Sequence, residues 1–510
     1  MADKTSLGRF FSGYRKNVIG HQQYFDSPFG RKKIVYADWT ASGRCYQPIE
    51  ECLQKRVMPF VANTHTNTTI TGTLMSKAYE QAKIIIKKHV HADQHDKLIF
   101  CGSGMTAAVN KLQRILGVRM PEQMRTYFKR DVTVVEIEEE LRPVVFITHM
   151  EHHSNHLSWL ETIADVVIIE KDEKGNVDLI QFRNLLEQFS KRKNKWAAVT
   201  ACSNVTGIQT PYHEIARMIH AYDGLCFVDF ACSAPYVDIN MHPGEACSDL
   251  DAIYFSFHKF LGGPGTPGVL IFNQKLYRNS IPDHPGGGTV IYSNPWNDRA
   301  YVTDIEMRED GGTPPFLQGI KAAMCVQLKE EMGVANIFAR EQELLRIIFS
   351  RILLIRHLKV LEPDNLKRLG VISFIVEGAH YNLIVKLLND RFGIQMRGGC
   401  SCAGTYGHKL LAIDRVRSFE LLRSIQAGDL SCKPGWIRLS IHPTMTDSEM
   451  NHILDALEET AAHFQEWESD YLYDPQTNEY RFKDSVSGEE KKIIQWYDSK
   501  SWNNHERDYR

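Results

Sequence analysis

The chain has 510 residues, of which 43% are hydrophobic and 24% are charged, and its formal net charge at pH 7 is −2. These fractions are typical of globular proteins and exclude a disordered or fibrous chain. The near-neutral charge gives no electrostatic basis for nucleic acid or an anionic membrane as the main partner. A small-molecule ligand is therefore favoured.

The sequence contains no apolar run long enough to span a membrane, since even residues 347–358 are interrupted by Arg351 and Arg356. The N-terminus lacks the apolar core of a signal peptide. Eleven cysteines, an odd number spread over a long chain, favour reduced thiols over a disulfide framework. We therefore predict a cytoplasmic protein without membrane association.

From about Ile34 onward, short β-branched segments alternate with helical patterns, which is typical of βαβ units around a mostly parallel sheet. The predicted strands are Lys97–Phe100, Val144–Thr148, Val166–Ile169, Ala197–Thr200, Leu225–Val228 and Ala252–Ser256. The fold class is thus α/β, with the sheet flanked by helices. Ligands of such sheets bind at the carboxyl ends of the strands.

After Gly312 the pattern changes to that of a smaller α+β domain. We predict an amphipathic stretch at Gln318–Leu358, strands at Val371–Val376 and Trp436–Ile441, a helix near Tyr381–Phe392, and a final helix with a capping box at Thr446–Glu449. The predicted divisions are an N-terminal segment (1–33), a large domain (34–312), a small domain (313–465) and a polar C-terminal tail (466–510). The charged segment 121–141 is predicted to be a surface insertion.

Two strand ends carry the strongest chemical signal. One strand ends in Asp229, and a later one ends in His258 and Lys259 before a glycine-rich turn. Pyridoxal 5'-phosphate (PLP) needs a lysine amine for its aldehyde and a carboxylate against its pyridine nitrogen. A buried lysine also has a lowered pKa, which suits a base. Taken alone, such a pair is far more often an ordinary strand-end Asp and a solvated loop Lys, so the other motifs are needed to favour PLP.

Three further turns contribute polar groups. Gly102 to Thr106 form a glycine-rich turn before a helix, where free amides favour a phosphate, although many such turns are only tight turns. His152 follows another strand, where an imidazole suits stacking on a cofactor ring and proton transfer. Asn204 follows a third strand and suits a cofactor oxygen or a substrate carboxylate; the alternative is a local turn motif.

Together these motifs resemble class V aminotransferases of PLP fold type I, most closely the cysteine desulfurase and selenocysteine lyase branch. The similar motifs appear in the family's order and cover most of residues 34–459. They are YADWTASG from Tyr36, AYEQAK from Ala78, GMTAAVN from Gly104, MEHHSNHLSW from Met150, SNVTG from Ser203, VDFACSAP from Val228, SFHKFLGGPGTPGVL from Ser256, GGTP from Gly311, RGGCSCAG from Arg397 and RLSIH from Arg438. The resemblance implies a large domain with a seven-stranded type of sheet.

The resemblance also implies roles for individual residues. Lys259 would be the Schiff-base lysine, Asp229 the partner of the ring nitrogen and His152 the stacking residue. The cofactor phosphate would be held by Gly104, Met105, Thr106, Ser256 and His258. Thr313 matches a position that reaches the phosphate of a neighbouring subunit, which implies a homodimer. Asn204, Arg438 and Arg397 would lie around the substrate, and a guanidinium suits a carboxylate.

Cys402 matches the sulfur-accepting cysteine of the desulfurases, where a thiolate attacks the substrate sulfur. The alternatives are that Cys400 and Cys402 are inert thiols, or form a Cys-x-Cys metal site, for which no second ligand pair is evident. The chain departs from the family at Cys232, where a Gln is frequent, at Met105 in place of a threonine, and at Cys400-Ser401 in place of a second histidine.

The resemblance therefore predicts an enzyme that removes sulfur or selenium from a cysteine-type amino acid to give alanine. A sulfur-acceptor protein is a possible partner. Two alternatives stay open: PLP-dependent transamination, lyase or epimerase chemistry on another amino acid, and a catalytically degenerate interaction protein. The joint presence of Lys259, Asp229, His152 and Arg438 argues against the last.

Overall fold

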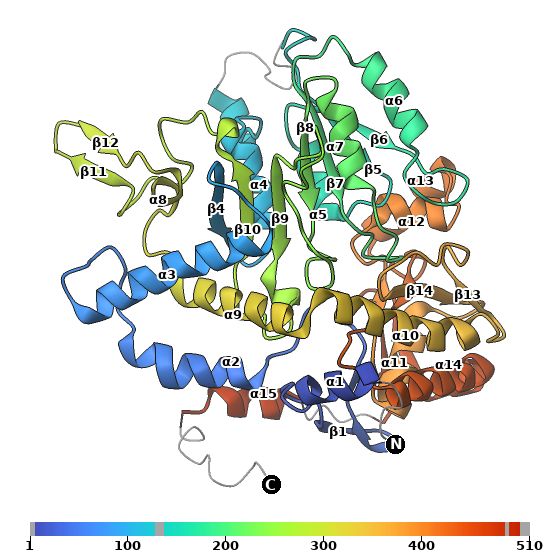
Figure 1. The fold of residues 1–510 in the computed structure, drawn as a ribbon. Helices are drawn as coiled ribbons and strands as arrows, with labels where there is room; N and C mark the ends of the chain where they lie inside the picture. The colour runs from blue at the N-terminus through green and yellow to red at the C-terminus, as the bar shows by residue number, and fades with distance from the viewer. Residues whose placement is uncertain (1–5, 128–136, 485–488, 500–510) are drawn as a thin grey trace.

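The computed structural model describes residues 6–127, 137–484 and 489–499 (Figure 1). It confirms the α/β class: a seven-stranded sheet has the order β4-β10-β9-β8-β7-β5-β6. The strands are β4 (Asp96–Cys101), β5 (Val144–Thr148), β6 (Asp165–Ile169), β7 (Lys195–Thr200), β8 (Leu225–Asp229), β9 (Ala252–Ser256) and β10 (Gly268–Asn273). All six predicted strands are present at the predicted places.

Strand β10 was not predicted, and it makes the sheet mixed. It lies antiparallel to both β4 and β9, whereas β5 to β9 run parallel. Every residue of β5, β7 and β9 is buried. This explains their nearly continuous apolar sequences, because strands covered on both faces have no polar side.

Helices cover both faces of this sheet (Figure 1). They include α4 (Met105–Ile115), α5 (His153–Leu160), α6 (Leu179–Gln188) and α7 (Tyr212–His220). Helices α3 (Ile70–His89) and α9 (Phe316–Met332) lie side by side below the sheet in Figure 1. The carboxyl ends of β5, β7, β8 and β9 face the smaller domain.

The smaller domain has a four-stranded antiparallel sheet, β13 (Leu358–Val360), β14 (Val371–Val376), β17 (Trp436–Ser440) and β16 (Arg397–Gly399), in that order. The predicted single stretch at Gln318–Leu358 is two helices, α9 and α10 (Val334–Ile352), because Gly333 ends α9 with a positive φ of 76°. The other helices are α11 (Tyr381–Phe392), α12 (Gly404–Leu410), α13 (Arg415–Gln426) and α14 (Asp447–Trp467). The predicted capping box of α14 is present.

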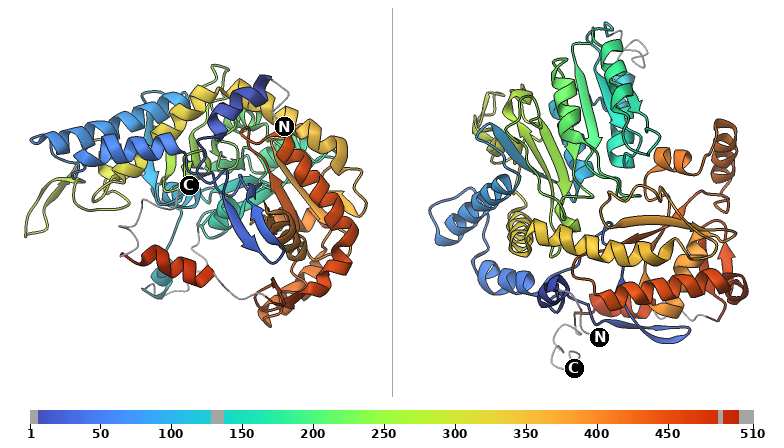
Figure 2. Two further views of the ribbon diagram at one scale, coloured as in Figure 1. Left: turned by 90° about the horizontal axis from the view of Figure 1, so that it is seen from below. Right: turned by 45° about the vertical axis from the view of Figure 1, so that its right-hand side comes forward.

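Parts of both terminal segments pack against this domain, whereas the last helix, α15 (Glu489–Tyr497), lies apart from it (Figure 2, left). At the N-terminus lie α1 (Ser6–Arg15), β1 (Tyr24–Ser27), β2 (Gly30–Lys33), β3 (Val35–Tyr36) and α2 (Gln47–Cys52), and β3 pairs with β15 (Ile394–Gln395). A hairpin of β18 (Tyr471–Asp474) and β19 (Glu479–Phe482) follows α14, before α15 (Glu489–Tyr497). An outlying hairpin, β11 (Val290–Ser293) and β12 (Arg299–Tyr301), precedes α8 (Ile305–Glu309).

The described helices and the cysteines bear on the predicted lack of a membrane span and of disulfides. No helix in the described ranges is long and apolar enough to cross a membrane. All eleven cysteines are free thiols. Of the predicted surface insertion, residues 128–136 lie outside the described residues, and Glu122–Tyr127 form a short 3-10 helix.

Candidate active site

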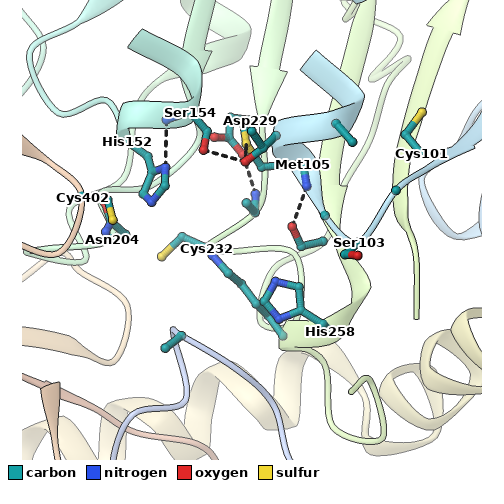
Figure 3. Close-up of a pocket in the computed structure, with 18 of the residues that line it drawn as sticks. Cys101, Ser103, Met105, His152, Ser154, Asn204, Asp229, Cys232, His258 and Cys402 are labelled. Carbon is teal, nitrogen blue, oxygen red and sulfur yellow. Dashed lines mark hydrogen bonds between the residues drawn. The ribbon is translucent and has the colours of Figure 1, made fainter. Parts of the chain in front are cut away.

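A cavity of about 1190 Å³ lies at the carboxyl ends of the large sheet's strands, against the smaller domain. All thirteen residues predicted for the site line it: Gly104, Met105, Thr106, His152, Asn204, Asp229, Ser256, His258, Lys259, Thr313, Arg397, Cys402 and Arg438. Figure 3 shows His152, Asn204 and Cys402 on one side and Ser103 and Met105 on the other, with Asp229 and Cys232 between them. The structure thus brings together residues spread over more than 300 positions.

Lys259 and Asp229 form the floor of the cavity. Asp229 is the last residue of β8, and Lys259 ends the 3-10 turn that follows β9, the neighbouring strand. Burial lowers the pKa of the Lys259 amine, so a larger fraction of the amine is neutral at physiological pH. Burial also raises the pKa of Asp229 to about 6, against the opposing effects of the bond from the Ala231 amide (2.8 Å) and of Lys259. Asp229 is therefore poised to share a proton with a basic partner.

His152 is neutral and has a defined tautomer. It is the N-cap of α5, where its Nδ1 accepts a hydrogen bond from the Ser154 amide at 3.1 Å. The proton of the neutral ring therefore lies on Nε2. Burial, and then the nearby Lys259, lower the pKa of His152 to about 3. A neutral ring suits stacking on a cofactor.

The N-termini of α4 and α5 form the anion-binding end of the cavity. Gly104, the N-cap of α4, provides no side-chain cap, and a Cβ there would lie 2.9 Å from Ser256 Oγ. Thr106 Oγ1 and Ser154 Oγ are 2.7 Å apart and join the two helix ends. The Met105 amide, predicted to serve a phosphate, instead donates to Ser256 Oγ at 2.8 Å. The remaining amides of the first turn and the helix dipole favour an anion.

The opposite end of the cavity contains two guanidinium groups that share one carboxylate. Asp38 accepts a hydrogen bond from Arg438 at 2.8 Å and another from Arg397 Nε at 2.9 Å. Two cations and one anion leave one positive charge for a substrate carboxylate. Asp38 was missed by the sequence analysis, although it lies within the YADWTASG motif.

Two buried polar atoms at this end lack hydrogen-bond partners among the described residues. They are Asn204 Oδ1 and Arg438 Nε. The amide of Asn204 is held in place because its Nδ2 donates to the Ser401 carbonyl at 2.7 Å. Buried polar atoms are costly unless bonded, so these two indicate where a polar ligand belongs.

Cys402 lies on a tightly held turn. Ser401 and Cys402 both have left-handed φ angles, 51° and 55°, and the Ala403 amide closes the turn on the Cys400 carbonyl at 3.0 Å. His153 fixes the turn by donating its amide to the Cys402 carbonyl (2.7 Å) and accepting from the Gly404 amide (2.8 Å). Cys402 is exposed and lines the cavity, whereas Cys400 is half-buried. A strained, anchored turn presents the Cys402 thiol at a fixed place.

Neither cysteine belongs to a metal-binding cluster. The one group of three metal-ligating side chains among the described residues is Asp93, Asp96 and His242, and it contains no cysteine. The Cys-x-Cys metal site therefore finds no support in the described part of the chain.

Cys232, at the cavity floor, has its pKa lowered by the hydrogen bond from the Cys202 thiol and then by Lys259.

These groups fit PLP. The cavity offers an amine of lowered pKa, a buried carboxylate that accepts protons readily, a neutral imidazole and an anion-binding pair of helix N-termini. This set matches an aldehyde, a pyridine nitrogen, an aromatic ring and a phosphate, respectively. Thr313 also lines this cavity in the same chain.

Comparison with known families gives a match to the model described as aminotransferase class-V, over residues 132–453. The chain belongs to the class V aminotransferase family. Members of this family are PLP enzymes. Curated relatives include a probable cysteine desulfurase of Staphylococcus epidermidis, 26% identical over 76% of this chain and 87% of the relative, and one of Halalkalibacterium halodurans, 27% identical over 74% and 86%.

Solved structures share the fold of this chain. The apo cysteine desulfurase of Thermococcus onnurineus superposes with a TM-score of 0.70 at 23% identity, covering 88% of this chain and 98% of that one. The cysteine desulfurase CsdA of Escherichia coli gives a TM-score of 0.66 at 18% identity, covering 89% and 98%. At these identities the likeness shows a shared α/β fold with a seven-stranded sheet.

Proposed function

We propose that this class V protein is a PLP-dependent, cysteine desulfurase-like enzyme, which removes sulfur or selenium from a cysteine-type amino acid and releases alanine. The observation that carries the proposal is the presence of Lys259, Asp229 and Cys402 in one cavity. The names of the curated relatives, probable cysteine desulfurases, support the same reaction.

Each residue has a role that follows from its surroundings. Lys259 would hold the cofactor aldehyde, Asp229 the ring nitrogen, His152 the ring face, and Thr106, Ser256 and His258 the phosphate. When bound, PLP supplies an electron sink that stabilises negative charge at the α-carbon. Arg438 and Asn204 orient the substrate carboxylate, and the Lys259 amine, with its lowered pKa, removes the α-proton.

Cys402 would receive the sulfur. Its thiolate attacks the sulfur of the substrate, so that an S–S bond forms as the Cβ–S bond breaks. The electron pair of the broken bond stays on Cβ, which takes up a proton to give alanine, and Cys402 is left as a persulfide. The hydrogen bonds of the anchored turn to His153 hold Cys402 at the cavity.

A second candidate keeps the cofactor but changes the reaction to transamination, lyase or epimerase chemistry. It is favoured by Cys232, which replaces a glutamine that is frequent in desulfurases. In that case Cys402 would be dispensable. We also propose a homodimer, with a sulfur-acceptor protein as a partner of the desulfurase form.

Alanine and sulfide production from L-cysteine under a reducing agent tests the proposal, with wild type, Lys259→Ala and Cys402→Ser compared. We expect both products from wild type and neither from either variant. Turnover of another amino acid that is lost with Lys259→Ala but kept in Cys402→Ser would support the second candidate. Cofactor binding without either product would contradict desulfuration of cysteine.

A further inference from the structure

The C-terminal tail contains a hairpin that docks along helix α11. At one end, the Tyr471 hydroxyl donates to Asp390 Oδ2 at 3.0 Å. At the other end, the rings of Tyr473 and Tyr480 lie 5.3 and 5.6 Å from the ring of His380, the N-cap of α11. The hairpin is therefore a packed element, and it follows the part of the chain that matches the family model, which ends at residue 453.

Asn478, in the turn of this hairpin, is buried and forms hydrogen bonds through its carboxamide and its carbonyl. Its Nδ2 donates to the Tyr381 hydroxyl at 2.8 Å, and its Oδ1 accepts from the Tyr473 hydroxyl at 2.9 Å. Its carbonyl accepts from Asn382 Nδ2 at 2.6 Å. A left-handed φ of 61° suits asparagine. Asn478 thus fixes the first two residues of α11.

Tyr381 is wedged between the hairpin and the strand that leads to the cysteine turn. A Cβ at Gly398 would lie 3.0 Å from Tyr381 Cδ2, and one at Gly435 would lie 2.6 Å from Tyr381 Cε1. Only glycine leaves room for the ring at these places. Because Gly398 lies in β16, directly before Gly399 and Cys400, the position of Tyr381 sets the position of this strand end.

These contacts form one wall of the cavity. Tyr381, Asn382 and Asn478 all line it, as do Cys400 and Cys402. Burial raises the pKa of the Tyr381 hydroxyl, against the opposing effect of the hydrogen bond from Asn478. The wall therefore runs from the C-terminal hairpin through Tyr381 to the cysteines.

We propose that the C-terminal hairpin is a specificity element of the active site. Through Asn478 and Tyr381 it fixes the wall beside Cys402, and this wall hinders bulky ligands that approach the sulfur through the cavity. The proposal does not depend on desulfuration, because it concerns access to the thiol.

The test compares labelling of Cys402 by iodoacetamide, which is small, and by fluorescein maleimide, which is bulky, in the cofactor-loaded full-length protein. Rates at Cys402 are followed by peptide mass spectrometry, with the exposed Cys247 as an internal reference. The test variant is Asn478→Gly, which deletes the carboxamide but keeps the left-handed backbone accessible. Gln476→Ala, at an exposed place in the same turn, is the matched control.

We expect the ratio of bulky to small labelling at Cys402 to rise about tenfold in Asn478→Gly, which is the effect of losing a hydrogen bond of ordinary strength. Gln476→Ala should leave the ratio unchanged. Should the glycine variant not fold, Asn478→Asp replaces it, since that residue keeps the acceptor for Tyr473 and loses the donor to Tyr381. An unchanged ratio in a folded Asn478 variant would overturn the proposal.

Discussion

The floor and the wall of the cavity are assembled differently. The floor residues Asp229 and Lys259 follow adjacent parallel strands of one sheet and lie 30 positions apart. In the wall, Asn478 bonds Tyr381, 97 residues away, and at the guanidinium end of the cavity Asp38 bonds Arg438, 400 residues away. The cofactor chemistry therefore depends on one sheet, whereas ligand selection depends on how the termini pack onto the smaller domain.

The largest effect should follow from replacing Lys259 in the floor of the cavity. In Lys259→Ala the amine that holds the cofactor and moves the proton is absent. We expect the visible absorption of lysine-bound cofactor to disappear and alanine production to fall by about 10⁴-fold or more, at the upper end for a general acid–base residue. Lys259→Arg, which keeps the charge, should be equally inactive. Activity within tenfold of wild type in either variant would place the catalytic amine elsewhere.

Asp229→Asn should have the next largest effect. The substitution keeps the shape but removes the carboxylate, whose pKa burial raises to about 6 and which is suited to pair with a ring nitrogen. Loss of one preorganised electrostatic contact reduces kcat by about 10²–10³-fold. Single-turnover rates at saturating cofactor measure the effect. An unchanged rate would show that Asp229 is a structural residue.

Asp38→Asn, behind the two guanidinium groups of the cavity, should change substrate binding more than chemistry. Without the shared carboxylate, Arg397 and Arg438 lose the group that orients both of them. We expect KM for the amino acid to rise about tenfold with kcat within about twofold, the pattern of a lost ground-state contact. Steady-state kinetics separates the two constants. A fall in kcat at constant KM would contradict the assignment of Asp38 to substrate binding.

The smallest effect concerns stability and pH. Burial raises the pKa of Glu341 to about 8 and that of Glu151 to about 7, from an ordinary value of 4.5. The folded state therefore keeps protons that the unfolded state releases, so the free energy of unfolding falls as the pH rises from about 5 to 8. Glu341→Gln, neutral at every pH, should reduce this slope by about 1 kcal/mol per pH unit. Denaturant unfolding at pH 5.5, 6.5 and 7.5 measures it; an unchanged slope would mean that Glu341 is ionised when folded.

The same contrast explains what the sequence predicts. The floor is encoded locally: strand, polar end and glycine-rich turn follow one another, so Asp229, Lys259 and the α4 turn are visible in the sequence. Strand β10 was not predicted. Its antiparallel direction cannot be inferred from its apolar residues, because these are the same in parallel and antiparallel strands. The hydrogen bonds of Asp38 and Asn478 depend on tertiary contacts between distant segments, which no local pattern reports. The close approach of Tyr381 to Gly398 and Gly435 is likewise seen only in the structure.

The most direct test of the account is the fate of the sulfur in a single turnover. Wild type loaded with PLP is mixed with one equivalent of L-cysteine without reductant, and alanine and the mass of the Cys402 peptide are measured together. We predict equimolar alanine and one added sulfur atom on Cys402, with neither in Lys259→Ala. Alanine formed without added sulfur on Cys402, or formed equally in Cys402→Ser, would contradict the assignment of Cys402 as the sulfur acceptor.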